Sequence, residues 1–457
     1  MSIAAAFESP LVRLVLLAVA AALIVLLVRE ARKIPARLVA LMATAFIDMI
    51  GLLMVVPLLP FYVQKLGVGG VEVAGLHLGV GFISGVIVSA YTVAQLLSAP
   101  GWGRFSDHYG RRPALLIALG ASGLAYLIFG FANSLLLLFL SRLVQGAGGG
   151  TVGVIQAYVA DATAPAERAR ALGWLSAATN LGVALGPVFG SLALSLGERD
   201  LQPGAGVLAM GPAAPGIMAA GLCFVNVIFA ARFLTESRVP YDARTMPARR
   251  STRQAAWRVL THSREASSRL ILIYAIAIGA FQGTNTILAL FLNARFAVTE
   301  KTIGYFFMYI GAISVFTRVL WLGRAVDRFG EARLSRFGII LLAGGLLLMP
   351  LSGTLPMLAV AVALIPLGTA FTFPCVTALL SRVIPSGERG LYMGLQQTFG
   401  GVARVVAPLF YGWAFDSLGV ATPFFFSSAF VLATIFLGFG LGGAALTAPI
   451  ETKPAST

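Results

Sequence analysis

Long apolar runs limit what this chain can fold into more than any other feature of its sequence. Runs of about 20 residues, the length that crosses the hydrocarbon core of a bilayer as a helix, recur along its 457 residues. Hydrophobic residues make up 58% of the chain and charged residues only 11%, whereas a soluble protein carries roughly 25% charged residues. The alternating segments of an outer-membrane barrel are absent from the sequence. We therefore expect an all-α membrane protein with many spanning helices.

We expect twelve spanning helices in two groups of six. A hydrophilic, arginine-rich stretch, 235–268, separates the groups and is predicted to be a cytoplasmic linker. The expected parts are an N-terminal six-helix bundle over 35–234, a C-terminal six-helix bundle over 269–445 and a cytoplasmic tail over 446–457. The predicted spans are 37–62, 79–101, 113–131, 135–161, 168–193 and 214–234, then 270–293, 303–322, 334–351, 355–383, 390–413 and 422–444.

A further apolar run, 11–28, precedes the two groups. It lacks the basic start and the small-residue cleavage site of a secretory signal peptide, and Arg29, Arg32 and Lys33 follow it. We predict an extra N-terminal transmembrane helix within 1–34; an uncleaved helix lying on the membrane surface is the alternative. Such a helix is also a candidate docking element for a protein partner.

Basic residues assign the two sides of the membrane. The net charge of +15 comes mostly from arginine, which on a soluble protein would suggest nucleic-acid binding. Here the arginines gather in alternate loops, and by the positive-inside rule those loops face the cytoplasm. The loops between them are nearly neutral and are predicted to lie outside. The arginine-rich segments are near 102–112, 162–170, 235–269, 323–336 and 382–389.

A charged motif that occurs twice indicates an internal duplication. Its first copy, 103–112 (GRFSDHYGRR), is predicted to be a short loop between two apolar runs. The second copy, 323–330 (GRAVDRFG), follows about 220 positions later. Glu167-Arg168 and Glu388-Arg389 correspond at nearly the same offset. Two six-helix halves related by an axis along the membrane normal are a transporter layout.

These motifs resemble those of the major facilitator superfamily. Gly103, Asp107, Gly110, Arg111 and Arg112 stand at the spacing of its signature between the second and third helices of the body. The second copy departs from the signature, with Glu331-Ala332-Arg333 after Gly330. Two further motifs are similar to those of the drug:proton antiporter branch, and 100–190 most resembles bacterial tetracycline efflux transporters. These motifs are Asp48-x-x-Gly51 in the first body helix and Gly182-x-x-x-Gly186-Pro187-x-x-Gly190 in the fifth.

The resemblance implies a secondary transporter in the inner membrane of a bacterium. Its two bundles would be related by pseudo-two-fold symmetry, and it would export small lipophilic or amphipathic molecules by proton-coupled alternating access. Two alternatives stay open: a facilitator that does not use protons, and a non-transporting subunit or assembly factor with the same fold. We expect no enzyme activity, cofactor, metal site or nucleic-acid partner, because Cys223 and Cys375 lie in apolar segments and no G-x-x-x-x-G-K-[ST] loop is present.

Asp48 is the strongest candidate for a coupling residue. It lies ~17 Å from the cytoplasmic end of its predicted helix at ~1.5 Å per residue, and an acid within a membrane is a functional hypothesis by default. Arg142, in the fourth helix, is predicted at the same level. Burial favours a neutral acid and a nearby cation favours the carboxylate, so substrate arrival could release a proton. A permanent ion pair that joins the two helices is the alternative.

The duplicated motif is predicted to form a cytoplasmic gate. We expect Asp107 to cap or bridge across to the other half and Arg111 to meet Asp161 at the end of the fourth helix. A solvated basic loop that only sets topology is the alternative. The predicted gate residues are Gly103, Asp107, Gly110, Arg111, Arg112, Asp161, Gly323, Asp327 and Gly330.

Two further sets of residues are predicted to shape the transport route. Gly182, Gly186 and Gly190 allow close helix contact in lipid, and Pro187 bends the helix, so the series would seal the route against leak. Uncharged polar residues within the spans are candidates for the substrate cavity, while the basic Arg318 and Arg404 either attract an anionic substrate or extend to an interface. The cavity candidates are Gln145, Gln156, Asn180, Gln282, Asn285, Gln396, Gln397, Arg318 and Arg404.

Overall fold

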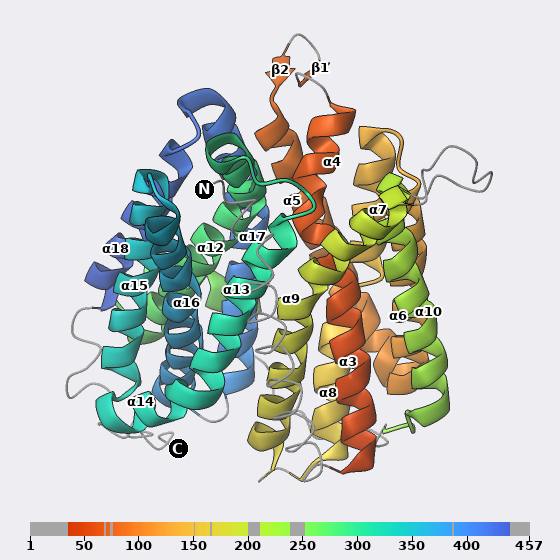
Figure 1. Ribbon diagram of the computed structural model, residues 1–457. Helices are drawn as coiled ribbons and strands as arrows, with labels where there is room; N and C mark the ends of the chain where they lie inside the picture. The colour runs from red at the N-terminus through yellow and green to blue at the C-terminus, as the bar shows by residue number, and fades with distance from the viewer. Residues whose placement is uncertain are drawn as a thin grey trace, which may run out of the picture. The chain divides into compact units, whose positions relative to one another are not determined.

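A computed structural model gives the fold, and the residues it describes form helices and one small hairpin (Figure 1). It describes residues 35–67, 70–73, 76–149, 151–164, 167–199, 211–237, 252–385 and 388–438. Within these residues, ten helices are long and apolar enough to span a membrane, and α18 (Thr422–Gly438) is apolar but shorter. The predicted extra helix at 11–28 and the predicted tail from 446 lie outside the described residues.

The first half of the chain follows the predicted spans closely, with two breaks. Pro57 interrupts the first span in the 3-10 turn η1 (Val56–Leu58), because proline cannot donate the helical hydrogen bond. Gly148 and Gly149 separate α7 from α8 within the predicted span 135–161. The elements are α3 (Ala36–Val55), α4 (Leu59–Leu66), β1 (Val71–Val73), β2 (Leu76–Leu78), α5 (Val80–Tyr109), α6 (Arg111–Gly130), α7 (Leu135–Ala147), α8 (Thr151–Ala162), α9 (Arg168–Arg199), η2 (Gly211–Ala213) and α10 (Ala214–Phe233).

The second half begins with a short helix inside the predicted linker, where Arg258 and Glu265 form a 2.8 Å ion pair. A π-helical turn, η4 (Thr317–Trp321), interrupts the second span of this half and contains Arg318. Such turns are rare and are frequently found at functional sites. The remaining elements are α11 (Thr252–Thr261), α12 (Ala266–Phe296), α13 (Ile303–Phe316), α14 (Leu322–Phe329), α15 (Glu331–Leu351), α16 (Leu355–Val383) and α17 (Arg389–Leu418).

The duplicated motif is helical rather than the predicted loop. Helix α5 continues to Tyr109, and α14 covers most of the second copy. In each copy a single glycine breaks the helix: Gly110 has φ +108° and Gly330 has φ +75°, a region that other L-residues rarely adopt. Added Cβ atoms at Gly103 and Gly323 would meet no described atom within 4 Å. These two glycines are therefore not sites of close helix contact.

A short antiparallel hairpin joins α4 to α5, and the prediction of an all-α protein did not include it. Strand β1 pairs with β2 with Glu72 opposite His77. The β-branched Val71 and Val73 favour an extended backbone. We call the end of α4 and α5 that carries these two strands the hairpin end.

The described helices pack into two compact units. The first contains the described residues before Ala243, together with Gly283–Val315 and Ala407–Pro423. In it, α3 packs against both α9 and α10, and α6 packs against α10 and α7. The second contains the other described residues, and α15 lies along α16 at its centre (Figure 1). The predicted bundle boundaries stay a prediction.

The internal duplication is visible in how the first unit is packed. An added Cβ at Gly85 of α5 would lie 2.3 Å from the carbonyl oxygen of Pro408 of α17. The corresponding contact joins Gly304 of α13 to the carbonyl oxygen of Pro187 of α9, at 2.5 Å. Both the glycines and the prolines are about 220 positions apart. Equivalent residues of the two halves therefore make equivalent close backbone contacts.

Candidate functional site

Asp48 is buried at the middle of α3, with only 4% of its surface exposed. The Thr151 hydroxyl, at the start of α8, forms a hydrogen bond with its carboxyl group. One turn earlier on α3, the Thr44 carbonyl accepts a 2.9 Å hydrogen bond from Asn226 of α10. Helices α8 and α10 thus surround this stretch of α3 with uncharged polar groups, which hold a carboxyl group in the interior without a fixed counterion.

Arg142 of α7 is also buried, with 1% exposure. Its Nε donates a 3.2 Å hydrogen bond to Ser141, and its guanidinium lies 5.4 Å from the centre of the Phe129 ring. Within the described residues no salt bridge joins it to Asp48 or to another acid. The alternative of a permanent Asp48–Arg142 ion pair is therefore wrong for this conformation.

Tyr126 of α6 connects the two charged residues, and the sequence analysis did not identify it. Its hydroxyl accepts a 2.7 Å hydrogen bond from Gln145 and interacts electrostatically with both Asp48 and Arg142. The ring packs so closely on α3 that an added Cβ at Gly51 would lie 3.2 Å from it. Tyrosines are ordinary core residues, and only the small Gly51 opposite could have marked this one.

Several buried polar atoms around this group have no partner within the described residues. Buried polar groups are nearly always hydrogen-bonded in folded proteins, so these atoms are open to bonding by water or a solute. The atoms are Thr44 Oγ1, Arg142 Nη2, Gln145 Oε1 and Asn226 Oδ1.

The predicted glycine series places α9 directly against the helix that carries Asp48. Added Cβ atoms at Gly182, Gly186 and Gly190 would lie 2.6, 2.7 and 2.2 Å from Phe46 O, Leu53 Cβ and Met54 O. These distances are shorter than real Cβ contacts, so only glycine permits this approach. Gly304 of α13 packs against Pro187 of α9. Helix α9 therefore has close backbone contacts with helices from both halves of the chain.

The first copy of the duplicated motif forms a network of charged groups. Arg111 donates hydrogen bonds to Asp161 at 2.8 Å and to Asp107 at 2.6 Å. The expected Arg111–Asp161 contact is present, whereas Asp107 pairs with a residue of its own copy. Arg112 donates to the carbonyl oxygen of Ala231. These contacts join the end of α5 to α6, α8 and α10.

Glu236 completes this network and was not predicted as a site residue. Its carboxylate accepts hydrogen bonds from the backbone N–H groups of Arg111 and Arg112, at 2.8 and 3.2 Å. These groups open helix α6, where the helix dipole favours a negative charge. An added Cβ at Gly110 would lie 2.4 Å from the same carboxylate. Glu236 lies within the predicted basic linker, and the many arginines near it in the sequence give no sign of this contact.

At the hairpin end, side chains join segments of the two halves. Asp416 of α17 accepts hydrogen bonds from the N–H groups of Gly81 and Phe82, at 2.9 and 2.8 Å. Ser191 of α9 accepts one from Gly304 N at 3.1 Å, so the starts of α5 and α13 are each capped by the opposite half. Lys65 and Glu300 form an ion pair. We call these contacts the hairpin-end lock.

The predicted cavity residues are distributed over both units. Gln145 and Asn180 belong to the first unit, where Asn180 donates to Ser176 O at 2.6 Å, and Gln156 there is exposed. In the second unit, Thr377 donates to Gln396 at 3.3 Å and Arg404 to Tyr274 at 3.4 Å. In the same unit Gln397 is exposed, and Gln282, Arg318 and Arg404 are partly buried, as is Asn285 of the first unit. Their assignment to a substrate cavity stays a prediction.

Comparison with known proteins decides the family. The family model described as the Major Facilitator Superfamily matches residues 41–322 and 270–456. The chain belongs to the major facilitator superfamily. Membership confirms the predicted family, makes the chain an integral membrane transporter rather than an enzyme, and accounts for the doubled motif and the doubled packing contacts.

Relatives within the superfamily include drug and tetracycline resistance proteins. Multidrug resistance protein 2 of Bacillus subtilis (strain 168) is 26% identical over 407 residues, which cover 88% of this chain and 93% of the relative. The class B tetracycline resistance protein of Escherichia coli is 25% identical, over 80% of this chain and 85% of the relative. A crystal structure of a human organic anion transporter covers 88% of this chain and 99% of its own, with a TM-score of 0.63 at 23% identity. The structural likeness shows the fold alone.

Proposed function

We propose that this chain exports small lipophilic or amphipathic organic molecules in exchange for protons, by alternating access, in the inner membrane of a bacterium. Asp48 carries the proton. The observation that carries this proposal is its burial at the middle of α3 without a salt bridge within the described residues, next to Thr151 and Tyr126. A carboxyl group in such a place can exist in either protonation state, because no fixed cation holds it ionised.

The polar group around Asp48 supports coupling between proton and substrate. Tyr126 interacts electrostatically with both Asp48 and Arg142, so its side chain lies between the proton site and Arg142. A substrate that bonds to Arg142 or Gln145 changes the surroundings of Tyr126 and favours release of the proton from Asp48. Protonation from the other side of the membrane then resets the site.

Packing supports alternating access. Helix α9 contacts α3 of the first half through its own glycines and α13 of the second half through Gly304, which brings the backbones close together. Smooth glycine surfaces allow two helices to tilt against one another while the contact stays sealed. The hairpin-end lock, which joins segments of the two halves, is the set of contacts that would break and re-form.

Transport into proteoliposomes with an imposed pH gradient tests the proposal. The probes are ethidium, tetracycline and fluorescein, which represent a lipophilic cation, a polar drug and an organic anion. The wild type should accumulate at least one probe against its gradient, and Asp48→Asn should abolish this accumulation. Glu72→Gln, which changes an exposed acid on β1, should behave as the wild type. A facilitator would equilibrate a probe without responding to the pH gradient, and a non-transporting subunit would move none.

A further inference from the structure

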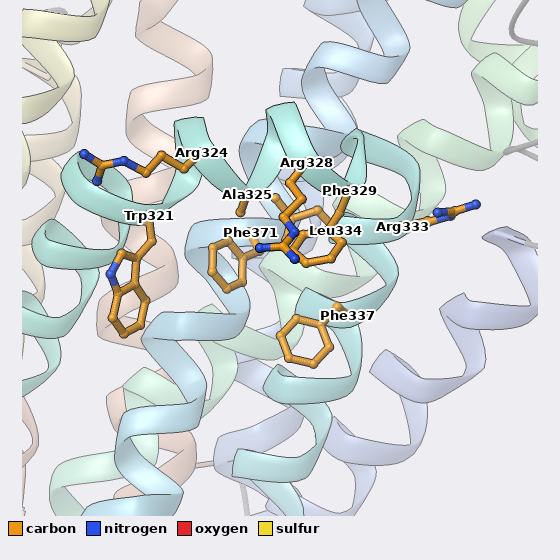
Figure 2. A pocket seen from close by; sticks show the side chains of 9 residues that line it. All are labelled: Trp321, Arg324, Ala325, Arg328, Phe329, Arg333, Leu334, Phe337 and Phe371. Carbon is orange, nitrogen blue, oxygen red and sulfur yellow. The ribbon is translucent and has the colours of Figure 1, made fainter.

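The second unit contains an apolar pocket where two spanning helices meet. Its volume is about 550 Å³, and α14, α15 and α16 supply most of its wall. Figure 2 shows aromatic rings at its centre and arginines around them. The lining residues are Trp321, Arg324, Ala325, Arg328, Phe329, Arg333, Leu334, Phe337 and Phe371.

The floor of the pocket is buried and its rim is exposed. Leu334 and Phe371 belong to a buried core cluster, with 4% and 6% exposure. Trp321, Phe329 and Phe337 are each more than half exposed. Monomeric soluble proteins rarely expose such a concentration of large apolar side chains. The rim therefore faces an apolar environment, or is covered by a molecule with apolar chains.

Three arginines border this apolar surface, and within the described residues none of them forms an ion pair. Arg324 donates only to the carbonyl oxygen of Leu320, at 2.8 Å. The Arg328 guanidinium lies 5.6 Å from the centre of the Phe329 ring and reaches in among the rings, while Arg324 and Arg333 extend to either side (Figure 2). Of the nearby acids, Glu331 pairs with Arg382 and the exposed Asp327 has no such bond within the described residues.

The first copy of the motif shows how unusual this arrangement is. There, Arg111 is neutralised by Asp107 and Asp161, and Arg112 bonds to a backbone carbonyl. The second copy has Glu331 and Ala332 where the first has Arg111 and Arg112, and its Arg333 stands one position further on. The arginines that border the pocket are therefore available for an external anion, whereas Arg111 and Arg112 of the first copy are used within the protein.

The pocket lies where a lipid headgroup would lie. The span Ile303–Phe329 ends at the pocket and the span Glu331–Leu351 begins there, so the pocket is at the level of a membrane surface. The arginine-rich loops predict the cytoplasmic surface. Tryptophan is enriched at this level, and basic pockets between spanning helices bind anionic headgroups.

We propose that this pocket binds an anionic phospholipid from the cytoplasmic leaflet. The headgroup phosphate accepts charge-assisted hydrogen bonds from Arg328 and from Arg324 or Arg333. The acyl chains cover Trp321 and Phe337. A soluble anion would leave those side chains uncovered. The ammonium group of a zwitterionic lipid would place a further positive charge next to the three arginines. Helix α14 lies between η4 and Gly330, the glycine that ends it, and it carries most of the second copy of the motif. A lipid bound to α14 would therefore also hold this copy in place.

Thermal unfolding of the full-length protein in detergent tests this proposal, with added dioleoyl phosphatidylglycerol as the probe. The lipid should raise the melting temperature of the wild type by several degrees, since a ligand that binds only the folded state stabilises it. Phosphatidylcholine and inorganic phosphate should each raise it much less. Native mass spectrometry should show one retained phosphatidylglycerol per chain.

Variants separate the arginine site from general lipid effects. Arg324→Gln/Arg328→Gln/Arg333→Gln should lose at least half of the phosphatidylglycerol-induced shift, and the matching triple lysine variant should retain most of it. Arg104→Gln, the equivalent of Arg324 in the first copy, should keep the full shift. If the triple glutamine variant does not fold, Arg328→Gln alone should show a reduced shift. An equal shift with phosphatidylcholine or with inorganic phosphate, or an undiminished shift in the glutamine variants, would overturn the proposal.

Discussion

At the scale of single residues, the protein keeps a guanidinium in its interior that pairs with no acid among the described residues. Arg142 is the largest of the side chains with less than 2% exposure, and an arginine at the centre of a spanning helix costs about 2.5–3.5 kcal/mol or more. The Phe129 ring and one serine hydroxyl recover only part of this cost. Retaining so costly a residue is understandable if Arg142 works with Tyr126 and Asp48 in transport.

The Tyr126 hydroxyl should therefore matter for coupling more than for folding. Tyr126→Phe removes the hydrogen bond from Gln145 and should lower stability by about 1 kcal/mol. It should also weaken proton-driven accumulation of a probe in proteoliposomes. Tyr158→Phe is the matched control, because it removes an equally buried hydroxyl that donates to the Thr235 carbonyl at 2.7 Å. Equal transport by the two variants at equal stability would show that Tyr126 has no part in coupling.

The sequence could predict charged residues in apolar runs, but it could not predict their partners. Asp48 and Arg142 stand out because acids and arginines are rare within spans. Tyr126 and Thr151 are of types common in any helix, and they gain meaning only when α6 and α8 pack beside α3. Glu236 lies among arginines in the sequence, which do not indicate that its carboxylate caps α6. Partner choice depends on tertiary packing, which no local pattern records.

At the scale of helices, glycine determines which pairs pack closely. The spacing of Gly182, Gly186 and Gly190 predicted a close contact, and the structure shows that the partner is α3. The starts of the spans were predictable to within a few residues because their apolar length is set by the bilayer, whereas α5, α9 and α14 continue past the predicted ends. The prediction of loops at 103–112 and 323–330 was wrong, because arginine is a good helix former and one glycine is enough to end each helix.

Alanine substitutions along α9 test this contact. Gly190→Ala would place a Cβ 2.2 Å from the Met54 carbonyl oxygen, and forcing the helices apart should cost about 1–3 kcal/mol. Gly173→Ala, on the same helix, meets no described atom within 4 Å and should be neutral or stabilising by up to about 1 kcal/mol. Thermal unfolding in detergent measures both, and similar melting temperatures would contradict the close packing.

At the scale of the whole molecule, one duplicated design places equivalent contacts at the hairpin end. Gly85 meets Pro408, and Gly304 meets Pro187, while Asp416 and Ser191 cap the starts of α5 and α13. The motif offset predicted a duplication, but the residues of the lock are not part of any motif and could not be predicted. Alternating access requires these contacts to open in another state.

Removing the Asp416 carboxylate should shift the equilibrium between the state in which the hairpin-end lock is closed and the state in which it is open. Asp416→Ala deletes two hydrogen bonds to the start of α5, and a loss of about 1 kcal/mol would change the ratio of two states about fivefold. Double electron–electron resonance between spin labels at Gln64→Cys and Lys301→Cys should then show more of a longer distance. Both positions are exposed, whereas the native cysteines are buried. Glu72→Ala, the control, should leave the distance distribution unchanged. An unchanged distribution in Asp416→Ala as well would contradict a role for the lock.

Proton release from the purified protein tests the central claim most directly. The protein is held in weakly buffered detergent solution with a pH-sensitive dye, and the probe that the proteoliposomes identify as a substrate is added. The wild type should release about one proton per bound substrate, and Asp48→Asn should bind the substrate without releasing any. Equal release by the two proteins, or none from a wild type that binds its substrate, would contradict the assignment of the transported proton to Asp48.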